Sequence, residues 1–197
     1  MRKKLVLVGV LAALGGAEAV AQTVGTPVYL APYRAFAKSE LGATLSGPGG
    51  GAWALEGAYR YGIDRFDIGI RGGVLSWNDG TAVLAGADVR FRVIDHTEKF
   101  PLDGALTAGI GGQIGDVSIG YIPIGLSLGR RIELDGGVSF VPYIQPVLVP
   151  VFGDTSDLGV ALGLGVDFKI SKQFDLRVTG GIGEYIEGIG IGFAWIR

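Results

Sequence analysis

The only histidine of the chain is the first candidate for catalytic chemistry. His96 lies within Asp95-His96-Thr97-Glu98, where a neighbouring carboxylate could orient the imidazole as a general base. A solvated histidine in a turn explains the same residues with fewer assumptions, and one histidine cannot form a multi-histidine metal site. The chain has no cysteine, which also excludes a thiol nucleophile and cysteine-ligated metals. We therefore expect no catalytic residues, no metal, no cofactor and no enzyme activity.

Acidic and basic residues form the second group with chemical potential, because they become complementary when neighbouring segments pair as hairpins. Residues 52–61 can pair with residues 66–77 across the turn 62–65, so that Tyr61 faces Phe66. The opposite acid–base pairs are then Arg60 with Asp67 and Glu56 with Arg71. Opposite charges across an antiparallel pair stabilise their register by up to about 1 kcal/mol, so the sequence predicts this register.

A second hairpin shows the same complementarity. Residues 158–170 and 174–183, joined by residues 171–173, pair so that each acid again meets a base. The pairs are Asp167 with Arg177 and Lys169 with Asp175. Across the longer turn 94–101, Arg92 opposite Asp103 is a third case. A one-residue slip would move these charges to the other face of the sheet.

The chemistry of these charges depends on their balance. A ring of one sign would select ions in a pore, whereas neighbouring charges of both signs brace and fill the space between strands. Every pair is balanced, and this favours bracing over ion selection.

The segments that carry the charges have the two-residue period of β-strands. From Leu158 to Ile170, bulky apolar residues occupy one face, and the other face is mostly glycine and alanine with charges near one end. Glycine weakens a strand and gains nothing from facing water, but small side chains fit the crowded interior of a narrow barrel. We expect an all-β, transmembrane, antiparallel up-and-down β-barrel whose bulky face meets lipid. A soluble secreted β-sandwich with the bulky faces turned inward is an alternative.

About ten strands fit between turns rich in glycine, asparagine and aspartate. We expect them at residues 33–46, 52–61, 66–77, 81–93, 102–115, 117–130, 138–152, 158–170, 174–183 and 188–196. An even number of strands returns both chain termini to the periplasm. Eight strands is the alternative, because residues 33–46 and 117–152 are the hardest to divide into strands.

The N-terminus has the three parts of a secretory signal peptide. Basic residues 2–4 precede the apolar residues 5–14, and Ala19-Val20-Ala21 supplies the small residues of a cleavage site. The apolar stretch is shorter than the ~20 residues that a membrane-spanning helix needs, which argues against a retained anchor. We expect a cleaved signal peptide at residues 1–21 and a barrel domain at residues 22–197.

Prolines interrupt one expected strand at regular intervals. Pro142, Pro146 and Pro150 have equal parity, so all three remove a hydrogen-bond donor from the same side of strand 138–152. Pro123 weakens the pairing of the preceding strand. One hypothesis is a lateral opening through which a lipid or apolar solute passes. A local bulge or an early strand end is the simpler interpretation.

The last nine residues, Ile189-Gly190-Ile191-Gly192-Phe193-Ala194-Trp195-Ile196-Arg197, alternate small residues with apolar and aromatic ones. In this ending and in its strand pattern the chain resembles the small bacterial outer-membrane β-barrel proteins, which usually end on an aromatic residue. The resemblance implies a location in the outer membrane of a Gram-negative-type bacterium. It also implies contact with outer-membrane lipid and with the barrel insertion machinery during assembly.

Three functions remain open at the level of the sequence. The first is a structural or porin-like barrel that allows passive passage of a small solute through a narrow lumen bridged by charges. The second is a lipid-modifying barrel enzyme or a carrier of hydrophobic molecules that uses the proline-rich seam. The third is a soluble secreted β protein. A net charge of −2 without a basic surplus argues against nucleic acid as a partner.

Overall fold

The computed structural model describes residues 29–32, 38–116, 118–134 and 139–197. The expected signal peptide at residues 1–21 lies outside the described part, as do residues 33–37 of the first expected strand. Every element assigned in the described part is a β-strand. No helix of the described part is long and apolar enough to cross a membrane.

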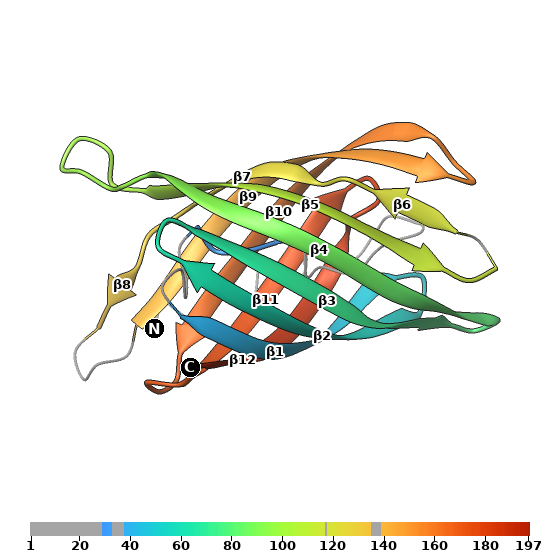
Figure 1. The fold of residues 1–197 in the computed structure, drawn as a ribbon, viewed down its shortest axis with the longest axis horizontal. Coiled ribbons are helices and arrows are strands. Elements are labelled where there is room, and N and C mark those ends of the chain that lie inside the picture. Colours follow the sequence, from blue (N-terminus) through green and yellow to red (C-terminus); the bar gives the residue numbers. More distant parts are fainter. Residues whose placement is uncertain (1–28, 33–37, 117, 135–138) are drawn as a thin grey trace, which may run out of the picture.

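The strands close into one antiparallel barrel (Figure 1). They are β1 (Ser39–Gly49), β2 (Ala52–Ile63), β3 (Phe66–Trp77), β4 (Gly80–Ile94), β5 (Asp103–Ile114), β6 (Ile119–Tyr121), β7 (Ile124–Gly129), β8 (Ile132–Glu133), β9 (Ser139–Gly153), β10 (Asp157–Lys169), β11 (Phe174–Gly183) and β12 (Gly188–Ile196). Each long strand pairs with its neighbours in sequence, and β12 pairs with β1. Because β6 and β7 share one place between β5 and β9, the barrel has ten strand positions.

The predicted fold class is therefore confirmed, and both the eight-strand and the sandwich alternatives are wrong. The described part of the expected segment 117–130, residues 118–130, occupies one strand position, but it breaks at Ile122 and Pro123 into β6 and β7. Proline has no N–H to give to a ladder, so a strand that contains it is readily interrupted there.

We call the two ends of the barrel the base and the rim. The base is the end at which β1 begins and β12 ends, and it includes the turns 64–65, 95–102 and 170–173. The rim is the opposite end, with the connections 50–51, 78–79, 154–156 and 184–187.

The outward face of the barrel is apolar on all sides. Along β2, for example, Leu55, Tyr59 and Tyr61 are 48%, 43% and 53% exposed, while Glu56, Ala58 and Arg60 point inward. Comparable side chains are exposed on the other long strands. A continuous apolar surface of this kind is unfavourable in water but is solvated by hydrocarbon, so the barrel is of the membrane type.

The predicted register of the first hairpin is wrong by two residues. β2 and β3 are joined by the two-residue turn 64–65, so Ile63 faces Phe66, and Arg60 faces Gly69 instead of Asp67. Glu56 faces Gly73 instead of Arg71. Two-residue turns suit the twist of a hairpin, and aspartate tolerates the positive φ of 49° found at Asp64. A two-residue shift keeps every side chain on its face, so the charges still point inward.

Of the other two predicted registers, one is right and one is wrong. Asp167 lies opposite Arg177 and Lys169 opposite Asp175 between β10 and β11, as the sequence predicts. Arg92 lies opposite Ala105 rather than Asp103, because the β4–β5 register shifts between Arg92 and Ile94. The prediction for Arg92 was thus wrong in register but right in the face of the strand.

Candidate functional site

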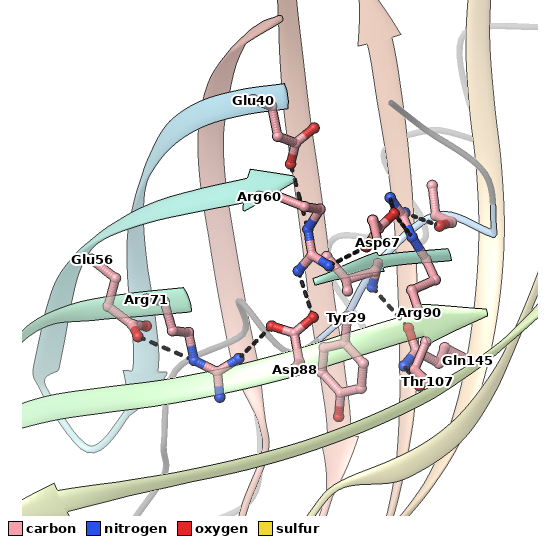
Figure 2. A network of polar contacts seen from close by, with 12 residues as sticks. Tyr29, Glu40, Glu56, Arg60, Asp67, Arg71, Asp88, Arg90, Thr107 and Gln145 are labelled. Carbon is pink, nitrogen blue, oxygen red and sulfur yellow. Dashed lines mark hydrogen bonds and ion pairs between the residues drawn. The ribbon is translucent and has the colours of Figure 1, made fainter. Parts of the chain in front are cut away.

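The candidate site is the interior of the barrel, where charged side chains gather toward the base. Arg60 of β2 is at the centre (Figure 2). Its guanidinium donates to Asp67 of β3 and, at 2.5 Å, to Asp88 of β4. Its Nε lies 3.7 Å from Glu40 Oε1 of β1. One side chain therefore ties four strands together, and Gly69 opposite it leaves the space, because a Cβ there would lie 2.6 Å from Arg60 Nη2.

Glu40 extends the network to β11 and β10. Arg177 donates to both carboxylate oxygens of Glu40, at 2.8 and 2.7 Å, in the planar two-pronged geometry that makes such pairs strong. Arg177 Nε also lies 3.3 Å from Asp167 Oδ2. The predicted pair Asp167–Arg177 is thus in contact. The strongest partner of Arg177, however, is Glu40, which the sequence analysis did not single out.

Arg71 connects the charges to the apolar part of the interior. Its Nε lies 3.6 Å from Glu56 Oε1 and its Nη1 lies 3.6 Å from Asp88 Oδ2. Its Nη2 donates to the hydroxyl of Tyr121 at 3.0 Å. Arg60 with Asp67 and Glu56 with Arg71 therefore meet as the sequence suggested, but diagonally rather than directly across the strands.

The remaining predicted charges lie closest to the base. Arg92 Nη2 donates to Asp103 Oδ1 at 3.2 Å, and His96 Nδ1 lies 3.0 Å from Asp103 Oδ2. Asp175 is buried and Lys169, opposite it, is exposed. The His96 side chain is also exposed, in the turn 95–102, and among the described residues its ring hydrogen-bonds with Asp103 alone. In the described part no three His, Asp or Glu side chains are placed to hold a metal ion.

A short N-terminal segment, residues 29–32, occupies the middle of the lumen, and we call it the plug. The barrel wall binds its backbone: Leu30 N donates to Gln145 Oε1 at 2.8 Å, and Ser127 Oγ donates to Leu30 O at 2.5 Å. Arg90 donates to Ala31 O and, at 2.6 Å, to Asp67 Oδ2. The plug thus shares Arg90 with the charge network.

The Tyr29 side chain of the plug lies in a slot made by two glycines. Gly163 of β10 and Gly181 of β11 face each other, and a Cβ on either would lie within 2.5 Å of the Tyr29 ring. The Tyr29 hydroxyl donates to Ile186 O, in the rim connection 184–187, at 2.6 Å. Burial raises the pKa of this hydroxyl, so it is a donor over the whole physiological range. The inward glycines that indicated a narrow lumen therefore make room for an aromatic ring.

Sequence reasoning missed the plug because residues 29–32 have no strand partner and no periodicity. The signal that was present is the run of inward glycines on β10. Gly163 admits Tyr29, and Gly165 admits the ring of Tyr143, whose hydroxyl donates to Tyr29 O at 3.3 Å. Each of these two glycines of β10 thus leaves the space that one aromatic ring occupies inside the barrel.

Toward the rim the interior is apolar rather than charged. The cluster is centred on β9, whose inward residues Val147, Val149 and Val151 are buried. Leu84 and Ile186 complete it from β4 and from the rim connection, and each is at most 2% exposed. Because these inward side chains near the rim are buried, the lumen is filled with side chains at this end as well.

The prolines of β9 all face one neighbour. Pro142 and Pro150 accept hydrogen bonds from Arg130 N and Ile122 N, at 3.3 and 2.9 Å. In a strand the N and O of a residue point to the same side, so the missing donors lie on the side of β6 and β7. The pairing between β7 and β9 is interrupted at Pro146, whereas β9 pairs with β10 over its whole length. Pro123 differs, because its O accepts from Gly109 N of β5.

The rim connections carry side chains whose protonation the fold alters. The Tyr185 hydroxyl donates to Asp157 Oδ2, at the start of β10, at 2.6 Å, and this bond raises the pKa of Tyr185. Partial burial raises the pKa of Glu187. Tyr185 has a positive φ of 66°, so its hydrogen bond holds a conformation that a non-glycine residue rarely adopts.

Comparison with known proteins supports the fold only. No family model matches the chain, and neither does any curated protein. Among solved structures, the β-domain of the Bordetella autotransporter BrkA has a TM-score of 0.53 at 15% identity over 80% of this chain and 98% of that one. A bacterial polysaccharide outer-membrane secretin has a TM-score of 0.49 at 10% identity over 74% of this chain. The chain spans 56% of the secretin's length. The similarity to the β-domain shows that the chain has the fold of a membrane β-barrel.

Proposed function

We propose that the protein is an outer-membrane barrel with a closed lumen and a structural role in the cell envelope. The observation that carries this proposal is that inward side chains are closed to water from base to rim. Asp67, Gln145, Val149 and Ile186 are each at most 1% exposed, and they lie at successive levels of the interior. A passive pore would need a continuous wet path past these levels.

The proposal predicts a barrel without steady conductance. The purified protein, reconstituted into planar lipid bilayers, is expected to show no stepwise current under conditions in which a general porin conducts. Steady single-channel steps would overturn the closed lumen and support a passive small-solute pore. Membrane insertion is tested separately: an outer-membrane fraction should contain a form that shifts in apparent size on boiling. A soluble periplasmic protein without such a shift would overturn the membrane location.

Export and assembly are part of the same proposal. Cleavage of residues 1–21, contact with outer-membrane lipid and handling by the barrel insertion machinery follow from the sequence pattern. We assign the barrel no catalytic role, since His96 and Asp103 have no described nucleophile beside them. N-terminal sequencing of the protein from outer membranes tests the cleavage site.

The proline seam supports a second candidate, a carrier of hydrophobic molecules. The seam between β9 and β6–β7 lacks three donors, and it borders the apolar part of the interior. The test is a disulfide across the seam, Leu126→Cys with Pro146→Cys, in a chain that has no other cysteine. If the seam opens, the disulfide should abolish transfer of a fluorescent fatty acid between vesicles. Equal transfer with and without the disulfide would remove this candidate.

A further inference from the structure

Among the described residues, the exposed lysines and arginines are confined to one end of the barrel, whereas exposed acids lie at both ends. The rim connections contain acids and, among the described residues, no lysine or arginine. The exposed lysines and arginines lie at the base: Lys38, Arg65, Lys99, Arg130, Arg131, Lys169, Lys172 and Arg197. The base therefore presents its cations at the level at which lipid headgroups meet the barrel.

One part of the base carries cations without exposed acids. The ends of three adjacent strands meet there: Lys172 precedes β11, Arg197 follows β12, and Lys38 precedes β1. All three side chains are exposed, and the acids of this region, Glu40 and Asp175, are buried inside the barrel. None of these three cations forms an ion pair with an acid of the described part, unlike Arg65, which pairs with Asp95.

A shallow, open hollow lies on the outer surface of the same strands. It has a volume of about 570 Å³ and is lined by Leu41, Gly42, Ala43, Phe174, Phe193 and Trp195. The small side chain of Ala43 lies between bulky neighbours, because it faces Phe193 across the β1–β12 pair and follows Leu41 by two residues. Trp195 faces both Leu41 and Phe174 and forms the end of the hollow toward the base.

We propose that this hollow and its cations bind one anionic phospholipid, with an acyl chain in the hollow and the phosphate at Lys38, Lys172 and Arg197. Each of these cations is two or three residues beyond the hollow, which is about 7–10 Å along the strand. In a phospholipid the headgroup lies beyond the acyl chains toward the bilayer surface, and the cations lie on that side of the hollow. The Arg197 guanidinium lies 4.9 Å from the centre of the Trp195 ring, so it is held over the end of the hollow.

Charge also argues against a second copy of the chain as the occupant. A symmetric dimer joins the same patch of each copy, so it would bring the two sets of cations together. An anionic lipid neutralises them instead. Cations at a bilayer surface each favour an anionic lipid by about five-fold, so the three should give a preference that is measurable above a neutral lipid.

The proposal rests on a barrel that spans a bilayer, and the tryptophans allow both statements to be tested in one experiment. Trp195 lines the hollow, whereas Trp53 is exposed near the rim on β2. The full chain is reconstituted into phosphatidylcholine bilayers with each of two reporter variants. One keeps only Trp195 (Trp53→Phe with Trp77→Phe), and the other keeps only Trp53 (Trp77→Phe with Trp195→Phe).

Quenching of each reporter is measured with brominated phosphatidylglycerol and with brominated phosphatidylcholine. At Trp195 we expect an apparent preference for phosphatidylglycerol of about five-fold or more, and at Trp53 a ratio near one. The triple variant Lys38→Gln, Lys172→Gln and Arg197→Gln should lose the preference. The matched triple variant Arg65→Gln, Lys99→Gln and Arg130→Gln removes as much charge from the base and should keep it.

Ala43→Leu tests the hollow itself, because it fills the space and leaves the cations in place. It should reduce the preference at Trp195. Equal ratios at Trp195 and Trp53, or loss of the preference in both triple variants, would overturn the site in favour of a general attraction to the base. Absence of quenching at Trp53 by brominated phosphatidylcholine would instead contradict the bilayer-spanning barrel.

Discussion

Arg60 is the residue on which the interior network depends most. Replacing it with glutamine would leave Asp67 and Asp88 buried without their shared guanidinium. Breaking a buried ion pair in this way costs about 3–5 kcal/mol. We expect Arg60→Gln to lower the urea midpoint of the detergent-solubilised barrel strongly. The change is read as the loss of the fast-migrating form on unboiled gels.

Arg65→Gln is the matched control for this substitution. Arg65 lies in the turn of the same hairpin and pairs with Asp95 at 3.3 Å, but both side chains are about half exposed. Exposed pairs contribute about 0–1 kcal/mol, so its midpoint should hardly change. Equal effects of the two substitutions would contradict a bracing role for the interior network.

The two glycines beside Tyr29 provide a test of the plug. Gly163→Leu would place a side chain where the Tyr29 ring now lies, and we expect it to expel residues 29–32 from the lumen. A single cysteine at position 30, introduced as Leu30→Cys, reports this in a chain without other cysteines. The thiol should be protected from maleimide in the parent and reactive after Gly163→Leu.

Gly57→Leu controls for the loss of a strand glycine. Gly57 faces outward, and the nearest atom to a Cβ there is 4.0 Å away, so the leucine enters lipid. The plug should stay protected in this variant. A reactive thiol in the parent itself would show that residues 29–32 do not remain in the lumen.

Glu187 gives the barrel a pH dependence whose sign follows from its burial. Its folded-state pKa lies above the ordinary value, so the folded state binds the proton more tightly than the unfolded state does. The barrel therefore has its full stability below the ordinary pKa of a glutamate side chain. That stability declines as the pH rises through the raised pKa of Glu187 in the folded state. Glu187→Gln should stabilise the barrel at neutral pH, and the difference should vanish in acid. A difference that is constant across pH would contradict this.

At the scale of elements, the alternation of residues predicts which face of a strand each side chain occupies. It does not predict the register between strands, nor a segment that has no alternation. The period of two places Arg60, Arg71, Asp167 and Arg177 inside, and the structure has all four there. The β2–β3 register is not determined by that period, because a two-residue shift leaves each face unchanged. Turn length decides it, and the two-residue turn at Asp64 prevails. The plug lacks any period, so only its glycine slots could have indicated it.

The proline-rich strand gives a prediction for hydrogen exchange. β9 pairs with β10 over its full length, but the β7–β9 register is interrupted opposite Pro146. Amides of β7 should therefore exchange faster than amides of β10 in the detergent-solubilised protein. The β2–β3 pair, which is uninterrupted, provides the reference for a closed ladder. Equal protection of β7 and β10 would show that the prolines do not weaken the seam.

At the scale of the whole molecule, the interior divides into a charged layer at the base and an apolar layer at the rim. The charged layer ties β1, β2, β3, β4, β10 and β11 through a few arginines. The apolar layer instead depends on contacts around β9. Removing charge should therefore affect closure near the base first, while the rim layer keeps the far end filled.

The confinement of the exposed cations to one end of the barrel gives it a direction in the membrane. An even number of strand positions places the beginning of β1 and the end of β12 on the same side, and that side carries the exposed cations. If the base faces the periplasm, the acidic rim connections face the cell exterior. A single cysteine in the rim turn, Asp79→Cys, should then react with a membrane-impermeant maleimide on intact cells. A cysteine at the base, Lys172→Cys, should react only after the outer membrane is opened. Labelling in the reverse order would show that the basic end faces outward, and the anionic lipid site would then have to lie in the outer leaflet.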